Sequence, residues 1–361
     1  DHGTSRGLGD VYKRQAFIGF GVWAHHMFAS AISPVAQAGF GLSTMIIAVP
    51  TGVKIFNWLG TIWGGKLTLN TPMLFALGFI GMFVIGGLSG VTHSVVPADT
   101  QQTDTYYIVA HFHYVLFGGA LFGIFSGLYF WFPKVWGRMY NETMGKIHFW
   151  LMLIGFNVTF GPMHWLGLQG QVRRTWVYAE ETNLGFWNLI VTIGAFILAV
   201  AILVFMANWI YSRRKGEKAP FDPWDARTIE WSIPSPTPVW NFSKAPEIKS
   251  LDDFWHQKYG EDEDGRAVRR EGTDELLLKL EEEGLNPDEE IHLPSPSYFP
   301  LILAFGLPFL GYAVIYKSIP LALIGVILLL IGGFGWGTEP LEEEFETSEE
   351  TPDAKESSTY E

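Results

Sequence analysis

Long apolar runs separated by short polar loops dominate the first 215 residues of the chain, and two more runs follow near its end. Seven runs are close to the roughly 20 apolar residues that a helix needs to cross a bilayer. They cover residues 40–58, 72–95, 105–132, 146–168, 184–211, 298–316 and 319–336, and a partial run covers 16–23. Soluble core helices do not repeat at this length, so the pattern predicts an all-α fold, a polytopic transmembrane helix bundle.

Polar stretches divide this pattern into parts. The expected parts are a transmembrane bundle at 16–215, a polar cytoplasmic linker with a short helix at 216–297, an additional transmembrane hairpin at 298–336 and an acidic disordered tail at 337–361. Residues 1–15 carry charges that would each cost about 2.5–3.5 kcal/mol at the centre of a membrane helix. We interpret them as a non-native junction in front of a truncated gene. The alternative is a polar cytoplasmic N-terminus on a naturally short protein.

Basic residues set the expected orientation, because positively charged loops favour the cytoplasmic side. The basic cluster at 213–218 follows the run at 184–211 and is predicted to be cytoplasmic. Alternation along the chain then places the loops at 25–26, 99–104 and 173–174 on the outer side. The pair Arg173-Arg174 breaks the charge trend, which calls for a local anionic partner. Glu180 or Glu181 could serve, and so could an anionic cofactor.

The charge balance and the amino-acid composition exclude several classes of protein. The formal net charge of −13 arises mainly beyond residue 215, so it describes the polar end and not the apolar part. The chain has no cysteine, which excludes a disulfide framework and any thiolate metal site. Nothing resembles the basic face of a nucleic-acid-binding protein.

Four histidines stand out against the apolar background. His111 and His113 lie two residues apart in the run at 105–132, and such positions on a helix are about 200° apart. They therefore cannot bind one metal ion from one face, and they point in opposite directions, as ligands of two centres would. His25 and His26 end an apolar segment, and neutral imidazole suits copper, iron and zinc. The alternatives are that His111 and His113 only bond to backbone carbonyls in a helix bundle, and that the adjacent pair at 25–26 lies in a loop by chance.

A lysine and a threonine share one face of the run at 40–58. Thr51 and Lys54 are three residues apart, and a lysine at membrane depth usually lines a proton or ion path. The alternative is that Lys54 extends its ammonium group to the cytoplasmic interface.

Several ordered motifs belong together. They are VWAHHMF (22–28), STMIIAVPTGVK (43–54), DTYYIVAHFHYVL (104–116), KIHFW (146–150) and the pair Arg173-Arg174. In this combination the chain resembles the catalytic subunit (subunit I) of heme–copper terminal oxidases, especially cytochrome c oxidase. The similarity runs from about Ala16 to about Phe242 and covers roughly the C-terminal half of that subunit, so the resemblance implies that the N-terminal helices are missing.

The resemblance implies roles for the four histidines. His111 matches the proximal ligand of the oxygen-binding heme, and His113 matches one axial ligand of the low-spin heme. His25 and His26 match two of three copper ligands. The remaining ligands of both centres lie in the missing half, so this chain is not expected to assemble a complete site alone. The implied cofactors are two hemes, of heme A type, and the copper B centre.

The resemblance also assigns the polar residues of the outer loops. It places Arg173 and Arg174 at the heme propionates, which the guanidinium fork binds well, with Asp99 nearby. Asp104 matches an aspartate that binds magnesium, but Thr103 stands where the family has the partner histidine, which puts the magnesium site in doubt. Asp104 is alternatively the N-cap or a first-turn acid of the next helix.

The proton path and the remaining histidines complete the candidate residues. The resemblance places Thr51 and Lys54, with a weaker claim for Thr44, in the lysine-type proton channel. His93, His148 and His164 lie near span ends and are interpreted as mainly structural.

The expected function follows from the resemblance. It implies a fragment of a cytochrome c oxidase that reduces O₂ to water and pumps protons, in a bacterial or archaeal plasma membrane. The implied partners are the copper-bearing subunit II, subunit III, cytochrome c and the lipid membrane, with no nucleic acid. The alternatives are a quinol oxidase or nitric oxide reductase of the same superfamily, or a cofactor-free membrane transport subunit.

Overall fold

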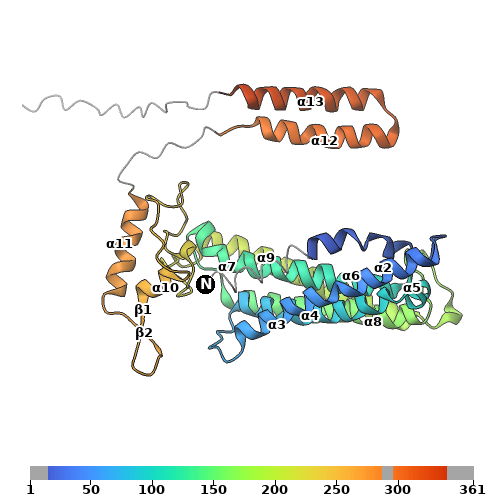
Figure 1. Cartoon of the computed structure of the whole chain (residues 1–361), viewed down its shortest axis with the longest axis horizontal. Coiled ribbons are helices and arrows are strands. Elements are labelled where there is room, and N and C mark those ends of the chain that lie inside the picture. Colours follow the sequence, from blue (N-terminus) through green and yellow to red (C-terminus); the bar gives the residue numbers. More distant parts are fainter. Residues whose placement is uncertain (1–14, 287–295, 340–361) are drawn as a thin grey trace, which may run out of the picture. The chain divides into compact units, whose positions relative to one another are not determined.

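The structure of the chain is a computed structural model that describes residues 15–286 and 296–339. These residues fall into two compact units, with the boundary between Leu285 and Asn286. The first unit holds a helix bundle and an extramembrane module, and the second holds a helical hairpin (Figure 1). The junction segment and the acidic tail expected from the sequence lie almost entirely outside the described residues.

The bundle is built from long helices that lie side by side in Figure 1. Its α-helices within residues 15–286 are α2 (Pro34–Ile46), α3 (Ala48–Ile62), α4 (Thr71–Ser94), α5 (Val96–Gln102), α6 (Tyr106–Val115), α7 (Phe122–Trp136), α8 (Glu142–Leu168) and α9 (Gly185–Lys215). Short helices of other types join them, namely η1 (Trp23–Met27), η2 (Leu116–Leu121) and η3 (Glu180–Thr182). The segment η2 is a π-helix that continues α6 into α7.

The predicted membrane spans are confirmed. Among the described residues, seven helical stretches are long and apolar enough to cross a membrane, and each overlaps one of the seven predicted runs. The predicted run at 40–58 is part of a longer stretch, Pro34–Ile62, which Ile47 divides into α2 and α3. Pro50 explains this division, because proline has no N–H to donate to the preceding turn.

Local sequence fixes several helix ends. The side chains of Ser33, Asn70 and Asn141 accept hydrogen bonds from backbone N–H groups in the first turns of α2, α4 and α8, as N-caps do. Gly137 ends α7 with φ of 63°, a left-handed conformation that favours glycine.

Glycines let the bundle helices approach one another closely. A Cβ atom at Gly194 of α9 would lie 2.5 Å from the backbone nitrogen of Thr159 in α8. Small residues serve the same purpose at many membrane helix interfaces. Buried aromatic rings fill the space between α4, α7, α8 and α9, including those of Phe75, Phe122, Phe125, Tyr129, Phe149 and Phe156. This packing fixes the helices that carry the candidate site.

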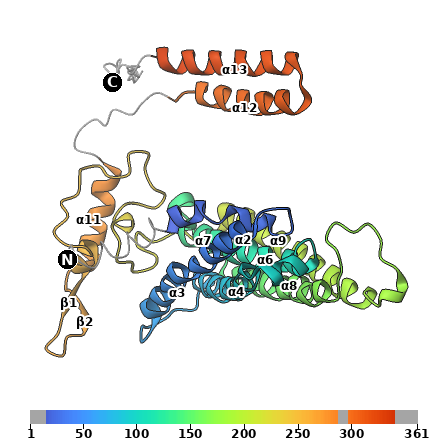
Figure 2. The same cartoon turned by 45° about the vertical axis from the view of Figure 1, so that its right-hand side comes forward.

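The extramembrane module follows α9 and is folded around its own core. It contains η4 (Ile229–Trp231), α10 (Asp253–Lys258), β1 (Tyr259–Glu261), β2 (Ala267–Arg269) and α11 (Thr273–Leu285). The two strands pair antiparallel, and their hairpin projects from the module (Figure 2). Phe221, Trp231 and Phe254 form the apolar core. The short helix predicted within residues 216–297 corresponds to α11, whereas the strand pair and the core were not predicted.

A buried lysine joins the elements of this module. Lys258 is fully buried, and its Nζ atom lies 2.5 Å from a carboxylate oxygen of Asp222, 2.9 Å from one of Asp225 and 2.8 Å from the carbonyl oxygen of Ala226. A buried cation needs partners of this kind, because desolvation is costly. The module is fastened to the bundle by Lys134 of α7, which donates to the carbonyl oxygens of Phe221 and Ile233.

The second unit is a hairpin of two apolar helices. They are α12 (Phe299–Tyr316) and α13 (Ile319–Thr338), joined at Lys317, which has φ of 48°. A Cβ atom at Gly332 would lie 2.5 Å from the backbone nitrogen of Leu303, so this glycine permits the contact. Both helices are long and apolar enough to cross a membrane, as the sequence predicted.

Candidate functional site

A cavity of about 650 Å³ lies within the bundle and gathers most of the predicted site residues. We call it the histidine cavity. The predicted site residues that line it are His25, His26, Thr44, Thr51, Asp99, His111 and Arg173. Apolar side chains such as Phe83, Leu88, Ile108 and Phe112 form much of the remaining wall. This volume and this apolar lining with a few polar groups are typical of a site for a cofactor or another organic ligand.

His111 is held from the side of α4. Its Nδ1 atom lies 3.0 Å from the carbonyl oxygen of Gly86 and 2.9 Å from the hydroxyl oxygen of Ser89. A Cβ atom at Gly90 would lie 2.9 Å from His111 Cε1, so glycine makes room for the imidazole ring. Because Nδ1 bonds to a carbonyl, Nε2 carries the free lone pair that a metal ion requires. His111 therefore fits the role of a heme ligand.

His113 lies against a different helix. Its Nδ1 atom donates to the carbonyl oxygen of Val109 at 2.8 Å, and its ring stacks on Phe160 of α8 with centroids 4.1 Å apart. It is absent from the lining of the histidine cavity. The expected separation of His111 and His113 to opposite sides of α6 is thus present in the structure.

His25 and His26 converge on one point. Both lie in the short helix η1, and their Nε2 atoms are 3.1 Å apart. Two nitrogens bound to one metal ion at about 2 Å lie roughly 3 Å apart, so the pair fits two positions of one metal centre. The hydroxyl group of Thr44 lies 3.1 Å from Nδ1 of His25 and helps to orient that ring. Among the described residues, no three His, Cys, Asp or Glu side chains form a metal-binding group.

The segments that hold Asp104 and Arg173 meet beside the cavity. Arg173 Nη2 lies 2.5 Å from Asp104 Oδ1, and the backbone nitrogen of Arg173 donates to the Asp104 carbonyl oxygen at 2.8 Å. Thr105 and Val172 form an isolated β-bridge beside this pair. The predicted grouping of the loops at 99–104 and 173–174 at one end of the bundle is therefore present in the structure.

Three details differ from the expectations. Within the described residues the carboxylate partner of Arg173 is Asp104, and neither Glu180 nor Glu181 pairs with it. The N-cap of α6 is Thr105, because Asp104 has φ of 58° and lies one residue before the cap. Arg174 is exposed with φ of 63° and is not part of the cavity wall.

The sequence did not predict one pair of buried side chains at the cavity, His93 and Asp99. His93 Nδ1 lies 3.3 Å from Asp99 Oδ1, and both side chains are buried. His93 also lines the cavity. A single histidine near the end of an apolar span gives no pattern that would identify such a pair, since only the turn between α4 and α5 brings Asp99 back to it.

The candidate proton-path residues lie in helices α2 and α3. Thr44 and Thr51 line the cavity, whereas Lys54 lies one turn further along α3 and is not part of the wall. The hydroxyl group of Thr51 accepts a hydrogen bond from Gln15 Nε2 at 3.0 Å and donates to the carbonyl oxygen of Ile47 at 2.8 Å.

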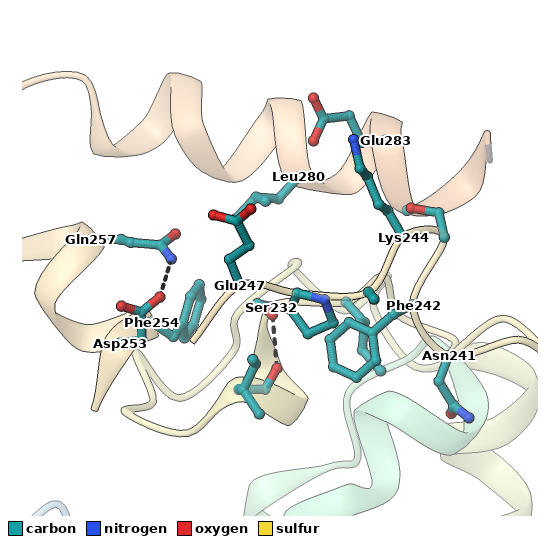
Figure 3. Close-up of a pocket in the computed structure, with 16 residues that line it drawn as sticks. Ser232, Asn241, Phe242, Lys244, Glu247, Asp253, Phe254, Gln257, Leu280 and Glu283 are labelled. Carbon is teal, nitrogen blue, oxygen red and sulfur yellow. Dashed lines mark hydrogen bonds between the residues drawn. The ribbon is translucent and has the colours of Figure 1, made fainter. Parts of the chain in front are cut away.

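A second pocket, of about 240 Å³, lies in the extramembrane module between α11 and the segment at 241–247 (Figure 3). None of the predicted site residues lines it. Gln257 donates to Asp253 at 2.8 Å on its rim. The predicted site residues therefore lie in the bundle, in or near the histidine cavity, and not at this second pocket.

The fold and the cavity define a class: polytopic helical membrane proteins with a ligand-sized cavity between their helices. Residues 14–197 match the family model described as cytochrome c and quinol oxidase polypeptide I, and the chain belongs to this family.

Bacterial cytochrome c oxidase subunits support this assignment. Subunit 1 of Alkalihalophilus pseudofirmus is 44% identical over 319 residues, which are 88% of this chain and 48% of that protein. Subunit 1 of Bacillus sp. (strain PS3) is 45% identical over 321 residues, which are 87% of this chain and 49% of that protein. Subunit 1 of Synechocystis sp. is 52% identical over 233 residues, which are 64% of this chain and 42% of that protein. The chain thus spans about half the length of these relatives.

The matched length changes one expectation. A match over 319 residues of this 361-residue chain must extend beyond Phe242, where the similarity was expected to end. A solved heme–copper terminal oxidase dimer is also similar, with 17% identity and a TM-score of 0.48 over 55% of this chain and 40% of that one.

Proposed function

We propose that this chain is part of the catalytic subunit of a cytochrome c oxidase in a bacterial plasma membrane, which reduces O₂ to water and couples this reaction to proton translocation. One observation carries the proposal. The Nε2 atoms of His25 and His26 converge to 3.1 Å, and His111, whose Nδ1 is already bonded, lines the same cavity.

The residues present fit the cofactors of the family. His111 would hold one heme, of type A, and His25 with His26 would hold copper at the copper B centre. His113 would hold the second heme on the other side of α6. When bound, these groups supply electrons and an open coordination position for oxygen.

The chain itself supplies the geometry. The carbonyl oxygen of Gly86 and the hydroxyl group of Ser89 fix the ring of His111, and Thr44 orients His25. Fixed outer-shell partners of this kind typically set ligand orientation and basicity. The apolar walls exclude water from the reacting groups.

Polar residues around the cavity would serve the heme carboxylates and the protons. Arg173 lines the cavity, and its buried Nε atom has no hydrogen-bond partner among the described residues, so it can donate to a carboxylate. Asp99, which lines the same cavity, is proposed beside it, and Arg174, which is exposed and follows Arg173 in the chain, is proposed to act at the outer edge of the same group. Thr44, Thr51 and Lys54, which lie along α2 and α3, would deliver protons. A magnesium site at Asp104 is not proposed, because its carboxylate pairs with Arg173.

The electron donor separates the two leading candidates. Cytochrome c, delivered through a copper-bearing subunit II beside a subunit III, is the proposed donor because relatives that are 44% and 45% identical are named cytochrome c oxidase subunit 1. A quinol oxidase is the second candidate, since the matched family includes both types. Family membership argues against a cofactor-free transport subunit.

Spectra and oxygen uptake test the proposal directly. Membranes that contain the full chain with its partner subunits are expected to show two heme signals, one sensitive to carbon monoxide, and cyanide-sensitive oxygen uptake with reduced cytochrome c. The band positions distinguish heme A from other types. Uptake with quinol alone would favour the quinol oxidase, and the absence of heme signals would overturn both candidates.

A further inference from the structure

One face of α4 is built around His111. Gly86, Ser89, Gly90 and His93 lie at spacings of three, four and seven residues, which places them along one stripe of the helix. The first three have clear tasks, because Gly86 and Ser89 bond to His111 Nδ1 and Gly90 gives its ring space. The fourth, His93, has no such task in the proposed function.

His93 lies directly against the His111 ring. The two ring centroids are 4.9 Å apart with an interplanar angle of 60°. The ring of His93 also makes a T-shaped contact with Tyr107, with centroids 5.3 Å apart. His93 is only 8% exposed, and neither of its ring nitrogens makes a hydrogen bond of regular geometry with the described residues. A buried imidazole without such bonds is costly unless something else uses it.

Asp99 lies beside one ring nitrogen of His93 and can orient its imidazole ring. It is 4% exposed, and its Oδ1 atom lies 3.3 Å from His93 Nδ1. Asp99 lies in the first turn of α5, which starts immediately after the turn that ends α4. The order of contacts is therefore a carboxylate, an imidazole and then the imidazole of His111.

We propose that Asp99 and His93 form a positioning pair that acts, through His111, on the heme held in the histidine cavity. The proposal rests on the proposed function. Charges act strongly in a buried, low-dielectric setting, and the groups around an axial ligand are one means by which a protein sets heme potential. A buried carboxylate favours the oxidised, more positive iron, so the pair lowers the midpoint potential of that heme.

Packing is the competing explanation. His93 could simply fill space between α4 and α6, with Asp99 satisfied by chance. Substitutions that preserve shape separate the two explanations. Asp99→Asn keeps the size of the side chain and removes the charge. His93→Phe keeps a ring against His111 and removes both ring nitrogens.

The test measures the midpoint potentials of both hemes in the full chain with its partner subunits. Asp99→Asn is expected to raise the potential of the carbon monoxide-sensitive heme and to leave the low-spin heme unchanged. His93→Phe is expected to shift the same potential, and Asp99→Asn is expected to have a smaller effect in the His93→Phe background, since coupled residues are not additive. His148→Phe is the matched control, because His148 is fully buried but bonds to Tyr129 away from the cavity.

Each outcome decides. Loss of the carbon monoxide-sensitive heme in Asp99→Asn together with an unchanged potential in His93→Phe would overturn the pair, because Asp99 would then act on the heme directly and not through His93. Unchanged potentials in both variants, fully additive shifts, or equal shifts in both hemes would overturn it. If the parent protein shows no heme at all, the proposed function fails; if the parent is normal and the variants are unchanged, only this inference fails.

Discussion

The buried ammonium group of Lys258 in the extramembrane module and the buried nitrogens of Arg173 and His93 at the histidine cavity differ in how far they are paired. In the module, Lys258 Nζ has two carboxylates and a carbonyl oxygen within 2.9 Å. At the cavity, the Nε of Arg173 and both ring nitrogens of His93 have no regular hydrogen bond among the described residues. A buried group that is fully paired holds the fold together, whereas unused bonding capacity around a cavity indicates a ligand.

The largest effect is expected at the cavity. His26→Ala should remove copper and reduce oxygen consumption by more than the 10- to 100-fold that typically follows loss of an outer-shell partner. The measurement is the copper-to-heme ratio together with oxygen uptake. His256→Ala is the control, because that histidine is exposed in the module. A full complement of copper in His26→Ala would contradict the assignment of the His25–His26 pair.

The next effect is expected in the module. Lys258→Met leaves Asp222 and Asp225 without their cation, and breaking a buried pair in this way typically costs about 3–5 kcal/mol. Thermal unfolding or limited proteolysis should show a destabilised module with unchanged heme spectra. Lys279→Met, on the exposed side of α11, should change stability by less than about 0.5 kcal/mol. Equal stability of the two variants would mean that Lys258 does not hold the module together.

A smaller effect is expected at Gly90 of α4, which leaves room for the His111 ring. Gly90→Ala places a Cβ atom 2.9 Å from His111 Cε1, and overpacking of this kind costs about 1–3 kcal/mol. The carbon monoxide difference spectrum should weaken or shift. Gly81→Ala is matched in helix and chemistry but meets no atom within 4 Å, so its spectrum should equal that of the parent. Identical spectra for both variants would refute the role given to Gly90.

The smallest effect concerns pH. Burial alone would raise the pKa of Asp225, but the hydrogen bonds from Tyr259 and Lys258 outweigh it and lower the pKa below 3.8. Since the folded pKa is lower than the unfolded one, the stabilisation is present above pH of about 4. It is lost as the pH falls through the folded pKa. Module stability measured against pH should therefore decline less steeply below pH 4 in Asp225→Asn, and an unchanged slope would contradict this.

The sequence predicted the spans well because an apolar run of bilayer length is visible residue by residue. The break between α2 and α3 at Ile47 was not predicted, although Pro50 causes it, because the hydrophobic run continues unbroken across this position. The sequence predicted a linker where the module folds. Its core could not be foreseen, because it depends on contacts between distant residues such as Lys258 and Asp222. Hydropathy does not reveal a charge that is buried with its partner.

In the candidate site, features set by local spacing could be predicted, whereas contacts between distant segments could not. The spacing of His111 and His113 determines their directions on any helix, so their separation could be foreseen. The partner of Arg173 could not, because it depends on which outer loops meet, and the structure pairs it with Asp104. A role for His93 could not be predicted either, because it depends on the contacts that the fold makes between His93, Asp99 and His111.

In the proposed function, α6 carries ligands to two separate hemes, one on each side. Optical spectra of His111→Ala and His113→Ala, recorded in the full chain with and without carbon monoxide, test it most directly. His111→Ala should lose the carbon monoxide-sensitive heme and keep the low-spin heme, and His113→Ala should do the reverse. Loss of the same single heme in both variants, or retention of both hemes in either, would contradict the claim.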